Sequence, residues 1–209
     1  MITIPQKNLP KKLMLILTLS ISLFCACLPE FVEPLPKEGN SYDNQIAGLW
    51  QRTIDTDTQQ LQVFPRKDGW LDFVFISGID QKDSNAGIEV MLFAGYTKNL
   101  NDNSFICFQI PQALMPEDSN DPTWYLASYK YPAPDKLQIR MFSMEKINVL
   151  IDQGKLKGDI TSDQTIVTSS SADLENLLKN LDIENFLQTE QDTIFNFSRP
   201  ENQKKTPKN

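Results

Sequence analysis

The sequence contains no histidine. Histidine is the usual base in Ser-His-Asp and Cys-His nucleophiles and the commonest zinc ligand, so its absence removes most hydrolase designs and most zinc sites. Glycine is scarce as well, and the eight glycines form no phosphate-binding loop, dinucleotide fingerprint or Gly-x-Ser-x-Gly elbow. The sequence therefore predicts neither an enzyme nor a protein that holds a cofactor or a metal ion.

Cysteine is limited to Cys25, Cys27 and Cys107, with no Cys-x-x-Cys pair. Cys107 lies in the apolar run of residues 105–110, where a free cysteine typically behaves as a small buried hydrophobic side chain. Basic residues are outnumbered, with 20 Lys and Arg against 27 Asp and Glu. Because an acidic protein repels phosphate backbones, we expect no nucleic-acid partner.

Long apolar runs are also few, and the clearest spans residues 13–24, after Lys7, Lys11 and Lys12. The apolar core of a secretory signal is about 7 to 15 residues long, whereas a spanning helix needs about 20. The run therefore predicts a cleaved signal peptide. The alternatives are an ordinary signal peptide without lipidation and an uncleaved anchor.

The residues that close this run, Leu23-Phe24-Cys25-Ala26-Cys27, resemble a bacterial lipobox, in which a small residue precedes a cysteine that is lipidated before cleavage. The resemblance covers residues 1–28 and implies that residues 1–26 are a lipoprotein signal peptide and that Cys27 becomes the lipidated first residue. It further implies export. By the sorting rule of Gram-negative lipoproteins, Leu28 implies an outer-membrane anchor, facing either the periplasm or the cell surface.

Composition divides the remaining chain into three parts. Residues 28–45 hold three prolines without periodicity, so we expect residues 27–45 to be the lipidated cysteine and a flexible tether. Residues 46–199 are expected to form a single β domain, and the polar residues 200–209 a disordered tail.

Period-two alternation of apolar and polar residues dominates the predicted domain; Leu137, Ile139 and Met141, for example, alternate with Gln138 and Arg140. Turn formers such as Lys67-Asp68-Gly69 separate these runs as hairpins. The pattern predicts a mainly β fold, either an antiparallel up-and-down barrel or a strongly curled sheet. Strands are expected at residues 46–54, 60–63, 70–76, 88–96, 104–110, 124–131, 137–141, 155–160, 165–168 and 193–197.

Two short helices interrupt the strands. The first begins after Ser143 and ends at Gly154, and the second begins with the capping pair Ser170 and Asp173. The second helix has an apolar face that we expect to pack on the domain, where it could close the open end of a barrel: Leu174, Leu177, Leu178 and Leu181.

Gly48-Leu49-Trp50, at the head of the first strand, resembles the Gly-x-Trp motif that opens lipocalins and related calycin barrels. In that family the tryptophan packs across the barrel floor, often under a basic residue from the end of the chain. The resemblance implies that Trp50 and Arg199 take these two roles, and it favours a lipocalin-like barrel that carries a ligand.

Aromatic residues supply the only positive hint of a binding site. Tyr125, Tyr129 and Tyr131 share one face of a strand, and the other aromatic residues lie in neighbouring strands: Trp70, Phe73, Phe75 and Phe93. These side chains either line a cavity for a small apolar ligand or pack as an ordinary core. Asp72 and Glu89 interrupt apolar strands, where they either point into a cavity, lie exposed at an edge, or pair with Arg52 or Arg140.

Three functions are compatible with these features. The first is a membrane-anchored envelope lipoprotein with a non-catalytic binding domain for a small apolar ligand. The second is an interaction or accessory module of an envelope complex. The third and least favoured is a carboxylate-dependent glycosidase, which needs two acids about 5 to 9.5 Å apart in a cleft.

Overall fold

The structure is a computed structural model that describes residues 28–39, 42–55, 57–78, 88–111, 114, 123–189 and 194–201. The predicted signal peptide at residues 1–26 and the predicted lipidated Cys27 lie outside these residues, as do residues 202–209 of the predicted tail.

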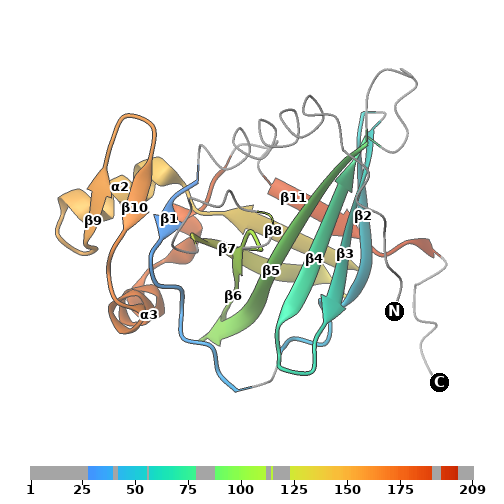
Figure 1. Cartoon of the computed structure of the whole chain (residues 1–209), viewed down its shortest axis with the longest axis horizontal. Coiled ribbons are helices and arrows are strands. Elements are labelled where there is room, and N and C mark those ends of the chain that lie inside the picture. The colour runs from blue at the N-terminus through green and yellow to red at the C-terminus, as the bar shows by residue number, and fades with distance from the viewer. Residues whose placement is uncertain are drawn as a thin grey trace.

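Within the described residues, eight antiparallel strands close into a barrel (Figure 1). Seven of them form an up-and-down meander: β2 (Gly48–Ile54), β3 (Asp57–Pro65), β4 (Leu71–Ser77), β5 (Glu89–Leu100), β6 (Asn103–Gln109), β7 (Trp124–Ala133) and β8 (Lys136–Met141). Within this meander β6 pairs with β7. The eighth strand, β11 (Ile194–Ser198), pairs with β8 on one side and with β2 on the other, and these two pairings close the ring. The mainly β, antiparallel barrel with two helices expected from the sequence is confirmed.

Successive side chains along each strand point alternately into and out of the barrel. In β4, Leu71, Phe73 and Phe75 are buried inside the barrel, whereas Asp72 lies on the outer face. Asp72 pairs there with Arg66, so of the alternatives left open by the sequence neither a position inside a cavity nor a pairing with Arg52 or Arg140 is found for it. Glu89, at the start of β5, is exposed.

The antiparallel meander gives the barrel two ends. The end with the β3–β4, β5–β6 and β7–β8 hairpins is called the floor, and the end with the β2–β3 hairpin, the end of β4 and the start of β5 is called the mouth. Tight turns at the floor place Asn101 at φ 53° and Gly69 at φ 80°, where a small or Asn/Gly residue costs least.

A second layer covers part of the outer wall, and we call it the annex. It consists of β1 (Glu30–Phe31) and of elements inserted between β8 and β11: α2 (Met144–Asp152), β9 (Gly158–Ile160), β10 (Thr165–Val167), α3 (Ser171–Asn180) and the 3₁₀ turn η2 (Ile183–Phe186). Phe31 of β1 pairs with Trp124 of β7, and β1 also lies parallel to β10, so the annex sheet continues from the barrel (Figure 1).

The annex has its own apolar core against the barrel. Outward-facing residues of β5, β6 and β7, among them Tyr96, Phe105 and Leu126, pack with buried residues of both helices. Leu174 and Leu178 of α3 are part of this core, so the leucine face covers the outer wall and does not close the barrel's open end. The expected capping of α3 is present, because the Ser170 side chain accepts from the Asp173 N–H.

The segment expected to be a flexible tether is instead packed on the domain over residues 28–39. Phe31 and Leu35 are 2% and 0% exposed and belong to the annex core, and Leu28 belongs to the barrel core. The Leu35 carbonyl accepts a hydrogen bond from the Tyr96 hydroxyl. Prolines and missing periodicity indicate irregular backbone, but burial here comes from isolated apolar residues that enter gaps between the barrel and the annex.

Candidate functional site

The floor of the barrel is built by Gly48, Trp50 and Arg199. Trp50 is fully buried, and its indole N–H donates to the Ile46 carbonyl at 2.7 Å. The Arg199 guanidinium lies 3.7 Å from the centre of the Trp50 ring. Gly48 has φ 103°, a backbone conformation that favours glycine, and a Cβ there would lie 2.6 Å from the Arg199 Nη1 and displace the guanidinium. The roles that the Gly-x-Trp resemblance implies for Trp50 and Arg199 are the roles these residues have here.

Next to Trp50 and Arg199, the Asp43 carboxylate accepts hydrogen bonds from several polar groups at the floor. Its Oδ2 accepts from the hydroxyls of Tyr129 and Tyr131 at 3.1 and 2.9 Å, and its Oδ1 accepts from the Gln45 N–H. Burial and the Asp43 carboxylate raise the pKa of both tyrosines. These tyrosines therefore stay protonated and hold the floor together as hydrogen-bond donors.

A cavity of about 80 Å³ lies inside the barrel, between the floor and the mouth. All of its lining residues are apolar. The aromatic ones are Phe73, Phe75, Phe93, Phe108, Phe195 and Phe197, and the others are Leu28, Leu61, Met91, Ile106, Ala127, Ile139 and Met141. A water molecule needs only about 10 to 15 Å³ of such volume, but apolar cavities of this kind stay dry because they offer no hydrogen-bond partner.

The structure brings only part of the predicted lining to this cavity. Phe73 and Phe75 line it, whereas Tyr129 and Tyr131 point inward nearer the floor, around Asp43. Tyr125 is in the barrel core, stacked on Phe108 at 5.6 Å, with its hydroxyl 3.4 Å from Glu30.

Trp70 does not belong to the cavity at all. It lies on the annex side of the wall, with its ring 5.7 Å from Tyr96 and 5.8 Å from Trp124. Other residues line the cavity although the aromatic residues of neighbouring strands did not predict them. Phe195 and Phe197 come from the last strand, and Leu28 comes from the segment expected to be a tether. Only the closure of the ring brings these residues together.

A second hollow, of about 550 Å³, lies beside the floor and is polar, with Asp43, Thr97 and Lys98 among its lining. The Lys98 side chain is 2% exposed, and its ammonium group pairs with Glu38 and, at 3.7 Å, with Glu175. Asp43 is held by the two tyrosines. The charges of this hollow therefore already have partners within the protein, as buried charges require.

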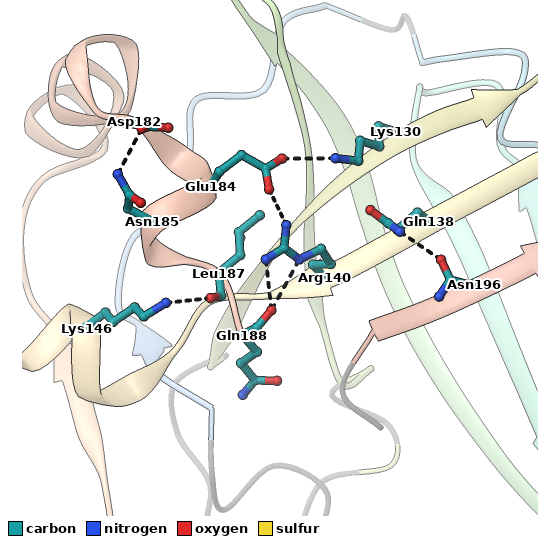
Figure 2. Close-up of polar contacts among 10 residues, drawn as sticks. All are labelled: Lys130, Gln138, Arg140, Lys146, Asp182, Glu184, Asn185, Leu187, Gln188 and Asn196. Atoms are coloured by element: carbon teal, nitrogen blue, oxygen red, sulfur yellow. Dashed lines mark hydrogen bonds and ion pairs between the residues drawn. The ribbon is translucent and has the colours of Figure 1, made fainter. Parts of the chain in front are cut away.

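Polar contacts also fasten the annex to the barrel, as Figure 2 shows. The Arg140 guanidinium on β8 donates to the Gln188 carbonyl at 3.2 and 3.0 Å and pairs with Glu184 of η2. Lys130 on β7 pairs with the same carboxylate at 3.0 Å, and Lys146 of α2 donates to the Leu187 carbonyl at 3.0 Å. We call residues 183–188 the strap, because these contacts hold it across β7 and β8.

The described part of the chain shows neither an accessible thiol nor a group of metal-binding side chains. Cys107 is buried, and burial raises the pKa of its thiol to about 12. Among the described residues, no three or more His, Cys, Asp or Glu side chains are grouped so as to hold a metal ion. No helix in the described ranges has the length and apolar character needed to cross a membrane.

The chain was also compared with known proteins. No protein-family model matches it, and neither the curated proteins nor the solved structures include a significant match.

Proposed function

We propose that this protein is an exported, lipid-anchored envelope protein whose barrel binds a small apolar group in its interior cavity without catalysing a reaction. The anchor in this proposal is an acylated Cys27 in the outer membrane, facing the periplasm or the cell surface. The observation that carries the binding role is the barrel cavity, because a lining without polar groups favours only apolar occupants.

The size and shape of the cavity narrow the class of ligand. A volume of about 80 Å³ between packed phenylalanine rings suits a slender aliphatic chain or a small ring. Larger ligands would need several rings to move, and a close-packed interior resists such movement. We therefore propose a straight or lightly branched alkyl group as the bound part.

Titration calorimetry with a series of straight-chain alkanols tests the binding role. We expect saturable one-to-one binding that tightens about fourfold for each added methylene, since each buried CH₂ contributes about 0.8 kcal/mol. The gain should stop at the chain length that fills the cavity. Absence of saturable binding across the series would reject the carrier role and favour the interaction module.

Ala127→Leu fills the cavity from β7 and should abolish alkanol binding, whereas Phe75→Leu enlarges it and should move the optimum to longer chains. Tyr129→Phe is the matched control on the same strand. It keeps the ring and loses only the hydroxyl near Asp43, so it should leave alkanol affinity unchanged. A Tyr129→Phe variant that binds as poorly as Ala127→Leu would place the ligand at the floor.

The anchor is tested separately, by intact-mass analysis of protein purified from its native host. We expect a chain that begins at Cys27 and carries acyl groups. A mature protein that begins elsewhere, without an acyl adduct, would reject the anchor while leaving the binding role open.

A further inference from the structure

The start of the described chain lies at the mouth of the barrel. The Leu28 side chain lines the cavity together with Phe75 of β4 and Met91 of β5, and these two are paired across the sheet near the mouth. Phe31 pairs with Trp124, the first residue of β7, so the described chain enters the domain at this end. Because residues 28–39 pack on the domain, no loose segment separates the described chain from the mouth from Leu28 onward.

The outer wall next to the mouth carries exposed aliphatic side chains. Val74 pairs with Leu92 and Ile76 pairs with Val90 across β4 and β5, and all four point away from the barrel. Val90 and Leu92 are 42% and 40% exposed, and Ile88, just before β5, is 64% exposed. We call these five residues the mouth patch.

Among the described residues, most of the remaining outer wall is polar or covered, and Phe64 of β3, 49% exposed, is an exception nearer the floor. On β8 and β11 the outward residues include Gln138 and Asn196, which hydrogen-bond to each other at 2.8 Å. On β5 to β7, toward the floor end of β5, the outward apolar residues lie under the annex. Contiguous exposed aliphatic residues are unusual on a protein surface and mark a contact with an apolar partner.

We propose that the mouth patch rests on the membrane at the boundary between headgroups and acyl chains, so that the barrel mouth faces the bilayer. This inference rests on the proposed anchor at Cys27. An acyl anchor on the proposed Cys27, the residue before Leu28, would hold the mouth close to the membrane surface, and the patch is an apolar protein surface next to that end. An apolar patch beside the acyl groups would add buried apolar area to the attachment.

The charged residues at the mouth indicate which kind of membrane surface it would contact. Asp55 and Glu89 are exposed at the same end, and carboxylates are repelled by anionic lipids. A zwitterionic surface therefore fits the mouth better than an anionic one. Entry of an alkyl group into the cavity would then take place directly from the membrane.

The test uses the acylated protein purified from its host and reconstituted on phosphatidylcholine vesicles. Leu92→Cys, or Val90→Cys as a second position, is labelled with an environment-sensitive fluorophore; Cys107 is buried and does not compete for the label. Lys67→Cys is the matched control, because it lies in the exposed β3–β4 hairpin at the floor end of the same wall. We expect the label at position 92 or 90 to shift to shorter wavelength and to lose accessibility to aqueous iodide several-fold on vesicles, with no change at position 67.

The outcomes separate the two proposals. If the protein floats with the vesicles but the label at positions 92 and 90 stays as exposed as at position 67, the docking inference is wrong and the anchor stands. If the protein does not float with vesicles, the anchor and the docking inference both fail. If the label is shielded equally without vesicles, the patch contacts a second copy of the chain, which also overturns membrane docking.

Discussion

Arg199 stabilises the floor through contacts that no other residue type can make together. Its Nη2 donates to the Gln45 and Ala47 carbonyls at 2.7 Å each, its Nη1 donates to the Leu49 carbonyl at 3.3 Å, and its plane covers the Trp50 ring. The planar guanidinium suits both tasks, because it presents several fixed donors and stacks on aromatic rings. Arg199 thus ties the end of β11 to the turn before β2 and to the start of that strand.

Arg199→Met is expected to lower the free energy of unfolding by about 2 to 3 kcal/mol, since three carbonyls lose a charged donor and the ring loses a cation. Urea unfolding followed by tryptophan fluorescence measures the change. Arg66→Met is the matched control: Arg66 pairs with Asp72 on the exposed outer wall, and such pairs contribute less than about 1 kcal/mol. Equal losses in the two variants would contradict the structural role given to Arg199.

At the scale of the element, the sequence predicts which face of a strand is buried but not how far along the barrel axis a side chain lies. Alternation places Trp70 on the same face as Asp72, and in the structure Trp70 packs against the annex core. The expectation that it lines a cavity is therefore wrong, because periodicity and not aromatic character decides which face of a strand is inside. Tyr129 and Tyr131 do point inward, as predicted. Their depth depends on the register of β7 against its neighbours, which only closure of the ring determines.

The strap makes stability depend on pH through Glu184. The hydrogen bond from Lys130, with a further one from Arg140, lowers the pKa of this carboxyl below its ordinary value. A lowered pKa in the folded state adds stability at pH values above the ordinary pKa, and this stability is lost as pH falls through the folded value.

Because the Glu184 side chain is 59% exposed, we expect a contribution of less than about 1 kcal/mol. Urea unfolding at pH 7 should show Glu184→Gln to be less stable than the unmodified chain, and the difference should disappear in acid. A difference that persists unchanged at low pH would mean that the substitution acts through packing and not through charge.

At the scale of the whole molecule, the segment at residues 28–39 joins the barrel, the annex and the proposed anchor. Its three prolines and its lack of periodicity indicate a tether, and nothing local in the sequence marks Leu28, Phe31 and Leu35 as buried. Their burial depends on cores assembled from distant strands and helices, with Tyr96 of β5 holding the Leu35 carbonyl. Burial that depends on such tertiary contacts cannot be predicted from the pattern of adjacent residues in the sequence.

Leu35→Ala tests whether this segment belongs to the folded domain. Leu35 is fully buried, so its truncation should lower the free energy of unfolding by about 2 to 4 kcal/mol, the usual cost of a cavity in a core. Val32→Ala, three residues earlier and 55% exposed, should change it by less than about 0.5 kcal/mol. A flexible tether would give two small and similar values in urea unfolding, and the proposed anchor would then be free to hold the barrel at a distance from the membrane. A large difference between the two variants means that residues 28–39 belong to the folded domain, which is the condition that the proposed membrane docking through the mouth patch requires.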